Sequence, residues 1–135
     1  MALRRKAREF ALQMLFQWEM SGQEPARVES TFWKGARAEK KTREFANQLF
    51  EGTAASARES DKLIERQAKH WRLERMAAID LNILRLGAYE LSAGETPAKV
   101  VINEAVELAK KFSSEDSAPF INGILDAVRK SLTKS

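Results

Sequence analysis

Apolar residues recur at intervals of three and four along almost the whole chain, which is the spacing of helices that bury one face. The sequence shows no convincing alternation of apolar and polar positions of the kind that strands produce. It therefore predicts an all-α protein of about seven helices. These are expected over residues 3–20, 25–34, 38–57, 60–71, 74–92, 97–112 and 119–132.

The stretch 74–92 differs from the others because it is apolar on two sides. One stripe is formed by Ala77, Leu81, Leu84, Ala88 and Leu91, and the opposite one by Ile79, Ile83 and Leu86. A helix that is apolar on two sides is buried on two sides, so we predict that this helix is the central element of the fold. Asp80 lies in the seam between the stripes, where its carboxylate either faces solvent or bonds to a partner.

Length and composition predict one globular domain. The chain has 135 residues, 44% of them hydrophobic and 31% charged, which is typical of a folded protein with a real core. It has no cysteine, which excludes disulfides and thiolate metal sites and fits a reducing compartment. No run reaches the ~18 apolar residues of a membrane span, so we expect a cytoplasmic protein.

The positive charge of the chain is concentrated at its beginning. The first eight residues hold four cations, Arg4, Arg5, Lys6 and Arg8, and no acid. The rest of the chain holds 19 basic and 19 acidic side chains, so the net charge of +4 belongs to this segment. Such a segment suits a polyanion, since Arg5 and Arg8 would present two guanidinium groups to phosphates from one helical face. The alternative is a disordered, solubilising arm.

Residue patterns that would carry catalysis are missing from the sequence. His70 is the only histidine and has no partner at the spacing of a metal site. The six glycines form no phosphate-binding pattern, and no HExxH or GxSxG motif occurs. Glu115 and Asp116 are adjacent carboxylates in a polar turn, where helix capping is the more frequent role. We therefore predict a binding protein without cofactor or metal, not an enzyme.

Two aromatic residues stand apart from the predicted core. Phe16 falls nearly opposite the buried stripe of the first helix, which indicates a protein contact or packing under a neighbouring helix. Phe120 lies at the edge of the last helix's apolar face, where it either packs in the core or stacks an unpaired base, worth ~1–3 kcal/mol. Asp116 beside it either accepts a hydrogen bond from a base amine or caps the helix.

Several long motifs, in this order, resemble the NusB family of transcription antitermination factors. They are RRKAR at 4–8, ALQMLFQW at 11–18, ILRLGAYEL at 83–91, VINEAVELAKKF at 101–112 and EDSAPFINGIL at 115–125. The resemblance covers the whole length apart from residues 21–41. It implies a single RNA-binding domain, built as two packed three-helix subdomains around a central helix, with subdomains of roughly 1–72 and 73–135.

The family resemblance also implies a function. It implies binding of single-stranded boxA RNA from ribosomal leader transcripts together with NusE, a ribosomal protein of the small subunit. The pair then joins other Nus factors on RNA polymerase and suppresses premature termination. Some relatives pair with themselves, so a homodimer is a further partner to test.

Residue roles carry over from the family by position. The resemblance implies an RNA site in this chain formed by Arg4, Arg5, Lys6, Arg8, Asp116 and Phe120. It implies a NusE-facing site formed by Phe16 and Asp80. This chain departs from the family at four positions. The family often has tyrosine in place of Phe16 and glutamate in place of Asp80. It has glycine in place of Ser113 and commonly a basic residue in place of Pro119. Asn122 and Gly123 are expected to be structural, because a glycine inside a helix costs ~1 kcal/mol and close approach of another helix would explain it.

Two other functions remain open from the sequence. One is a helical adaptor that binds proteins and no RNA. The other is a free-standing relative of the RNA-binding domain fused to ribosomal RNA cytosine methyltransferases, although the chain has no room for a methyl-donor domain and no nucleophilic cysteine. Loss of RNA binding without loss of partner binding, on removal of the first arginines, separates the adaptor from the RNA-binding protein.

Overall fold

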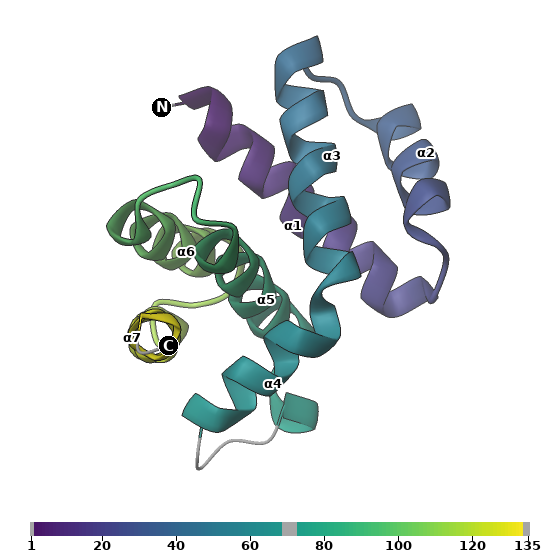
Figure 1. Ribbon diagram of the computed structural model, residues 1–135. Coiled ribbons are helices and arrows are strands. Elements are labelled where there is room, and N and C mark those ends of the chain that lie inside the picture. Colours follow the sequence, from purple (N-terminus) through teal and green to yellow (C-terminus); the bar gives the residue numbers. More distant parts are fainter. Residues whose placement is uncertain (1, 69–72, 134–135) are drawn as a thin grey trace. The chain divides into compact units, whose positions relative to one another are not determined.

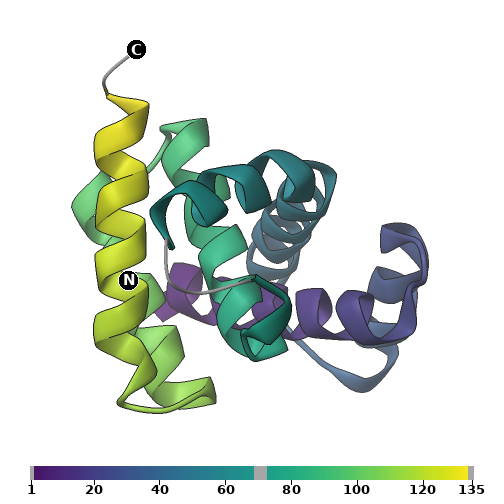
Figure 2. The same cartoon turned by 90° about the horizontal axis from the view of Figure 1, so that it is seen from below.

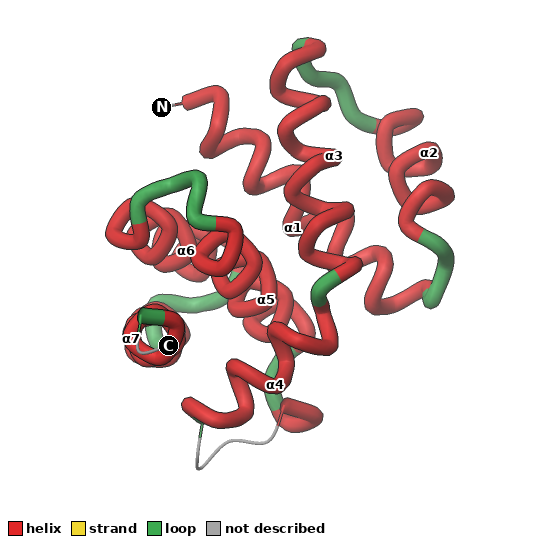
Figure 3. Tube along the Cα trace, viewed as in Figure 1, coloured by secondary structure: helices red, strands yellow, loops and turns green. Residues whose placement is uncertain are grey.

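Every regular element in the computed structural model, which describes residues 2–68 and 73–133, is helical. Figure 3 shows this part of the chain as helices joined by loops and turns, without a strand, which confirms the all-α prediction. The helices are α1 (Ala2–Ser21), α2 (Pro25–Gly35), α3 (Lys40–Ala55), α4 (Ala57–Gln67), α5 (Ala78–Ala93), α6 (Ala98–Phe112) and α7 (Ser117–Leu132), with a short 3₁₀ turn η1 (Leu73–Arg75) before α5 (Figure 1).

The chain forms two compact units, 1–55 with α1 to α3 and 56–135 with α4 to α7. The division falls before α4, whereas the sequence predicts it near residue 72. A partly buried ion pair joins α4 to α5 in the second unit. Arg85 donates from Nε to Asp61 Oδ1 at 2.8 Å and from Nη2 to Asp61 Oδ2 at 2.9 Å, and its Nη1 donates to Asn82 Oδ1 at 3.2 Å. This two-pronged contact holds α4 on α5.

The first unit is built around a cluster of aromatic rings. Phe10 of α1 meets Phe32 and Trp33 of α2 edge to face, with centroid separations of 5.8 and 5.2 Å, and Phe32 and Trp33 lie 4.9 Å apart. The stripe predicted on α1 is buried at Ala7, Phe10, Ala11, Met14 and Leu15, with Trp18 half-buried. The Trp33 indole donates to Asn47 Oδ1 at 2.8 Å and so links α2 to α3.

In the second unit α5 is the central helix, because it packs against α4, α6 and α7. Residues 81–88 are all buried, so both predicted stripes face inward over this stretch, whereas Ala77, predicted to belong to one of them, is exposed and precedes the helix. Gly87 lets α7 come close: a Cβ there would lie 2.7 Å from Leu125 Cδ1. The helix begins at Ala78 and not at 74, because Ala77 is extended, with φ −60° and ψ 139°, and separates α5 from η1.

Two further helix boundaries differ from the predicted ones. α4 begins at Ala57, earlier than predicted, while its predicted end at 71 and His70 lie outside the described residues. α7 begins at Ser117, before Pro119, because the Ser117 N–H donates to Ser114 Oγ at 3.2 Å and starts the helix there. In the described ranges, none of the helices combines the length and hydropathy needed to cross a membrane.

Candidate nucleic-acid interface

Three predicted site residues lie together where α5 and α7 begin. Asp80 comes from the first turn of α5, while Asp116 and Phe120 come from the start of α7, which Figure 2 shows along its length in yellow. They share a pocket of about 300 Å³. Among the described residues, this α5–α7 pocket is lined by Arg75, Met76, Ala77, Asp80, Asp116, Ser117 and Phe120.

Asp80 is held in place at one oxygen and unsatisfied at the other. Its Oδ2 accepts a hydrogen bond from Ser117 Oγ at 3.0 Å, which joins α5 to α7. Its Oδ1 is buried and has no hydrogen-bond partner in the described structure. The first turn of a helix favours a carboxylate through the helix dipole. Asp80 is therefore not a solvated seam residue, and it lines the pocket next to Asp116 and Phe120.

Asp116 precedes α7 and is exposed. Its side chain makes no capping hydrogen bond, since Ser114 Oγ accepts from the N–H of Ser117 instead. The capping role that the sequence offered for Asp116 is therefore not observed. An exposed carboxylate at the rim of a pocket can accept hydrogen bonds from an amine or an N–H group.

Phe120 is half-buried, so one part of its ring packs on the unit while another lines the pocket. Sequence reasoning missed Arg75 and Met76, which line the same pocket from η1 and the residue after it. Arg75 is exposed and adds a cation beside Asp116. No periodicity marks these two residues, because they lie in a break between helices about forty positions earlier in the chain.

The cationic start of the chain is the first part of α1 and not a disordered arm. Arg4, Arg5 and Lys6 are exposed. Arg8, by contrast, is only 3% exposed, so the prediction that Arg5 and Arg8 present a joint surface to phosphates is not met. The guanidinium groups of Arg4 and Arg8 instead lie 5.0 and 5.9 Å from the ring centroid of Phe45 on α3, an aromatic partner that the sequence analysis missed.

Phe16 is exposed, with 39% of its surface accessible, which favours the first of its two predicted roles, a protein contact, over packing under a neighbouring helix. Met20, one turn further along α1, is 59% accessible and extends this apolar face, while Leu12, one turn earlier, is fully buried. Phe16 and the cationic start belong to the first unit, and the α5–α7 pocket belongs to the second.

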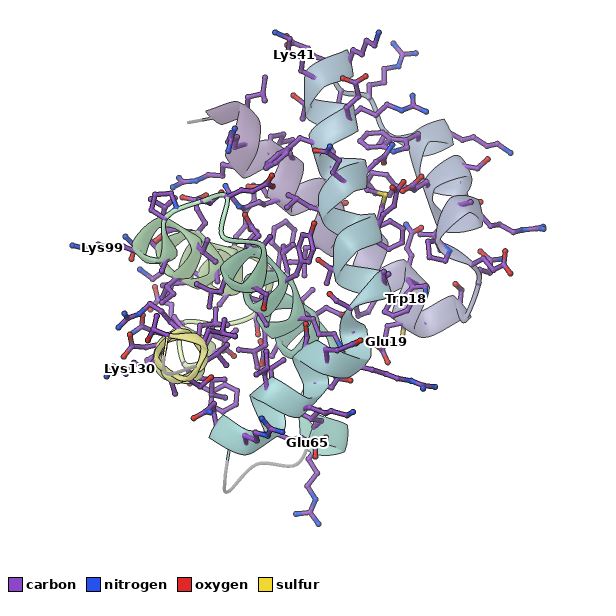
Figure 4. The ribbon with its side chains drawn as sticks, viewed as in Figure 1. Trp18, Glu19, Lys41, Glu65, Lys99 and Lys130 are labelled. Atoms are coloured by element: carbon purple, nitrogen blue, oxygen red, sulfur yellow. The ribbon has the colours of Figure 1, made fainter. Side chains whose placement is uncertain are left out.

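The exposed face of α7 ends in a cluster of charges. Asp126 accepts hydrogen bonds from Arg129 Nη2 at 2.7 Å and forms an ion pair with Lys130 Nζ at 3.2 Å. Hydrogen bonds from Arg129 and then Lys130 lower the pKa of Asp126 below its ordinary value. Lys130 projects away from its helix, as Figure 4 shows. Two cations surround one carboxylate, so this end of the face is positive.

A pair of carboxyl groups lies in the first unit between α2 and α3. Burial raises the pKa of Glu29 to about 8, helped by the hydrogen bond with Glu51 and its negative charge and opposed by Arg43. Arg43 also stacks over the ring of Trp33 at 5.1 Å. The Glu29 carboxyl is therefore protonated near neutral pH. Among the described residues no group of three or more acidic, histidine or cysteine side chains is placed to hold a metal ion.

Comparisons with known proteins identify the family of this chain. The profile of the NusB family matches residues 5–130. The transcription antitermination protein NusB of Koribacter versatilis (strain Ellin345) is 51% identical over 131 residues, which cover 96% of this chain and 90% of that protein. A chain in the crystal structure of a plectonemic RNA supercoil is 30% identical, with a TM-score of 0.88 and coverage of 100% and 99%. One in the crystal structure of antitermination factors NusB and NusE in complex with dsRNA is 30% identical, with a TM-score of 0.85 and coverage of 97% and 98%. The chain therefore belongs to the NusB family.

Proposed function

We propose that this protein is a transcription antitermination factor that binds boxA RNA of ribosomal leader transcripts together with NusE. Its relatives are named as antitermination proteins, and one similar structure contains NusB, NusE and RNA. With other Nus factors it joins RNA polymerase and keeps transcription of ribosomal RNA processive. The role is binding and not catalysis, needs no cofactor, and takes place in the cytoplasm.

The RNA site has two parts, one that binds phosphates and one that reads bases. Arg4, Arg5 and Lys6 supply exposed cations for phosphates, which give affinity without reading sequence. Arg8 is buried beside Phe45 and acts by holding the start of α1 on α3. Unpaired bases are read elsewhere, in the α5–α7 pocket.

The α5–α7 pocket is the observation that carries the proposal. It combines an aromatic ring for stacking, Phe120, with two carboxylates, Asp80 and Asp116, that accept hydrogen bonds from base N–H groups. Arg75 adds a cation for the neighbouring phosphate. Stacking on an aromatic side chain requires an unpaired base, so this pocket favours single-stranded RNA over a duplex.

NusE binds through the surface that includes Phe16. Its ring is exposed and lies next to exposed Met20, and an apolar patch of this kind is typical of a protein contact. Asp80 was predicted for the same surface by resemblance. It lies in the α5–α7 pocket, so a partner that reaches Asp80 also reaches the RNA site.

Titration of the full chain with three RNAs, each with and without NusE, tests the proposal. The RNAs are a single-stranded boxA oligonucleotide, its duplex with the complementary strand, and a scrambled single strand. We expect the boxA strand to bind best and NusE to strengthen it, because the partner adds cations beside the RNA and forms a composite surface. Equal affinity for the boxA and scrambled strands, even with NusE, would contradict the proposal.

Two other outcomes identify a rival function. Duplex RNA that binds as tightly as the single strand would exclude base reading in the pocket. A protein that binds NusE but no RNA at any salt concentration would be the helical adaptor that the sequence left open. Replacement of Arg4 and Arg5 by alanine separates these cases, because an adaptor has no RNA affinity to lose.

A further inference from the structure

Gly123 has no internal reason to be a glycine. It lies in the interior of α7, where glycine is unfavourable relative to alanine because it adds backbone freedom to the unfolded chain. Its position is exposed, and a Cβ built there meets no atom of the described residues within 4 Å. The expectation that another helix approaches closely at Gly123 is therefore wrong.

Gly87, by contrast, is a glycine at a close contact between two helices. A Cβ on Gly87 would lie 2.7 Å from Leu125 Cδ1, so the packing of α5 on α7 requires glycine there. Both residues are helical glycines of the same unit, and only Gly123 is open to solvent. The described residues thus leave open space at Gly123, where a ligand can approach the backbone of α7.

The position of Gly123 connects it to the α5–α7 pocket. Asp116, Phe120 and Gly123 follow one another at intervals of four and three, so they share one face of α7. Asn122 lies beside Gly123 and is also exposed. Its amide both donates and accepts hydrogen bonds, as does a ribose 2′-hydroxyl. These two residues form the Asn122–Gly123 ledge.

The same face becomes positive beyond the ledge. Asp126, one turn further on, would repel an RNA strand if it stood alone, but Arg129 and Lys130 neutralise it and leave an excess cation. From Phe120 to Lys130 the helix rises about 15 Å. A chain of contacts suited to RNA thus runs from an aromatic ring, past an open backbone, to a positive cluster.

We propose that the RNA strand whose base enters the α5–α7 pocket continues along α7, with a ribose on the Asn122–Gly123 ledge and the next phosphate near Lys130. This rests on the proposed RNA-binding function. The absence of a side chain at Gly123 lets the sugar approach the helix backbone, and the amide of Asn122 contacts its 2′-hydroxyl. The ledge therefore distinguishes RNA from DNA at this nucleotide.

The test compares Gly123→Ala, Gly123→Gln and Gly87→Ala in the full chain, by thermal unfolding and by titration with single-stranded boxA RNA. Gly123→Ala should raise the Tm by about 3 °C, because it removes a helical glycine without a clash. It should also weaken RNA binding about fivefold, and Gly123→Gln more than tenfold, since each side chain occupies the place of the ribose. Gly87→Ala should lower the Tm because Leu125 must move.

A second variant tests the sugar contact directly. Asn122→Ala should weaken binding of the all-ribose oligonucleotide about fivefold. The comparison is a set of oligonucleotides in which 2′-deoxyribose replaces one ribose at a time. Asn122→Ala should have almost no effect on the oligonucleotide whose 2′-deoxyribose lies at the contacted nucleotide. The wild type should lose affinity at one such position only.

The outcomes separate this inference from the proposed function. Failure of the wild type to bind boxA RNA would reject the RNA-binding function itself. Wild-type affinity in both Gly123 variants, while Phe120→Ala weakens binding, would overturn only the ledge. Loss of NusE binding with unchanged RNA binding would assign the ledge to a protein contact and would also overturn the inference.

Discussion

The start of α1 and the start of α7 are both proposed to bind RNA, and they do so with opposite means. The start of α1 offers exposed Arg4, Arg5 and Lys6 on a helix surface. The start of α7 offers a pocket lined by an aromatic ring, two carboxylates and the cation of Arg75. We expect the first region to attract any polyanion and the second to distinguish one base from another. Affinity and specificity are therefore separable by substitution.

The largest effect is expected at the cationic start. Replacing Arg4, Arg5 and Lys6 with alanine removes three phosphate contacts and should weaken RNA binding about 100-fold, at roughly 1 kcal/mol for each contact. The slope of log affinity against log salt should become shallower by about 2, because each phosphate contact on a single strand contributes roughly 0.7 to it. Binding measured at several salt concentrations gives both quantities.

A matched control for this triple variant is available in the same unit. Lys34, Arg37 and Lys40 are also exposed, so alanine there removes the same charge. If the control loses as much affinity as the Arg4, Arg5 and Lys6 variant, net charge alone explains binding and the comparison between the two regions collapses.

Phe120 should show the next largest effect, of a different kind. Phe120→Leu keeps an apolar side chain on α7 but cannot stack, so affinity for single-stranded boxA RNA should fall by ~1–3 kcal/mol. The salt slope should stay as in the wild type, because no phosphate contact is lost. Phe120→Trp should retain stacking and serves as the control. Thermal unfolding of each variant checks that the second unit remains folded.

Asp116 should affect specificity more than affinity. Asp116→Asn replaces two acceptors by one acceptor and one donor, and should cost about 1 kcal/mol for a base that presents an amine. The loss should disappear for a base analogue without the amine. Glu115→Gln, at the neighbouring exposed position, removes the same charge and should leave base preference unchanged. A similar loss in Glu115→Gln would show that general repulsion, not base reading, is measured.

The smallest effect concerns stability and belongs to the first unit alone. Because the pKa of Glu29 is raised to about 8 when folded, the unfolded chain releases its proton at lower pH, so folding stability falls between about pH 4.5 and 8. Glu29→Gln should remove this fall, on the order of 1 kcal/mol after solvent screening. Urea unfolding at pH 5 and 8.5 measures it, with Glu24→Gln as an exposed control. An identical pH dependence in wild type and Glu29→Gln would refute this assignment.

Helical periodicity predicted most of the fold. The burial of α1 and the central place of α5 both follow from apolar spacing, because apolar residues three and four positions apart form a stripe on the helix face that is buried. The start of α5 was not predictable in this way. Ala77 is extended without any glycine or proline nearby, and that break depends on tertiary packing.

The candidate site was predicted less evenly. Charge counting points to the cationic start, and position on the last helix, together with the family resemblance, points to Asp116 and Phe120. Neither found Arg75, nor the burial of Arg8, because both depend on which surfaces meet in the folded chain. Gly123 was assigned an internal role since a sequence cannot show whether the space around a helix is filled.

The shared position of Asp80 has a thermodynamic consequence for assembly. Its carboxylate lies with Asp116 in the pocket proposed for a base, where its negative charge repels the RNA backbone. If NusE places a cation against Asp80, as the proposed partner surface implies, that cation would remove the repulsion and tighten RNA binding. By linkage, RNA must then tighten NusE binding by the same factor, whichever of the two arrives first.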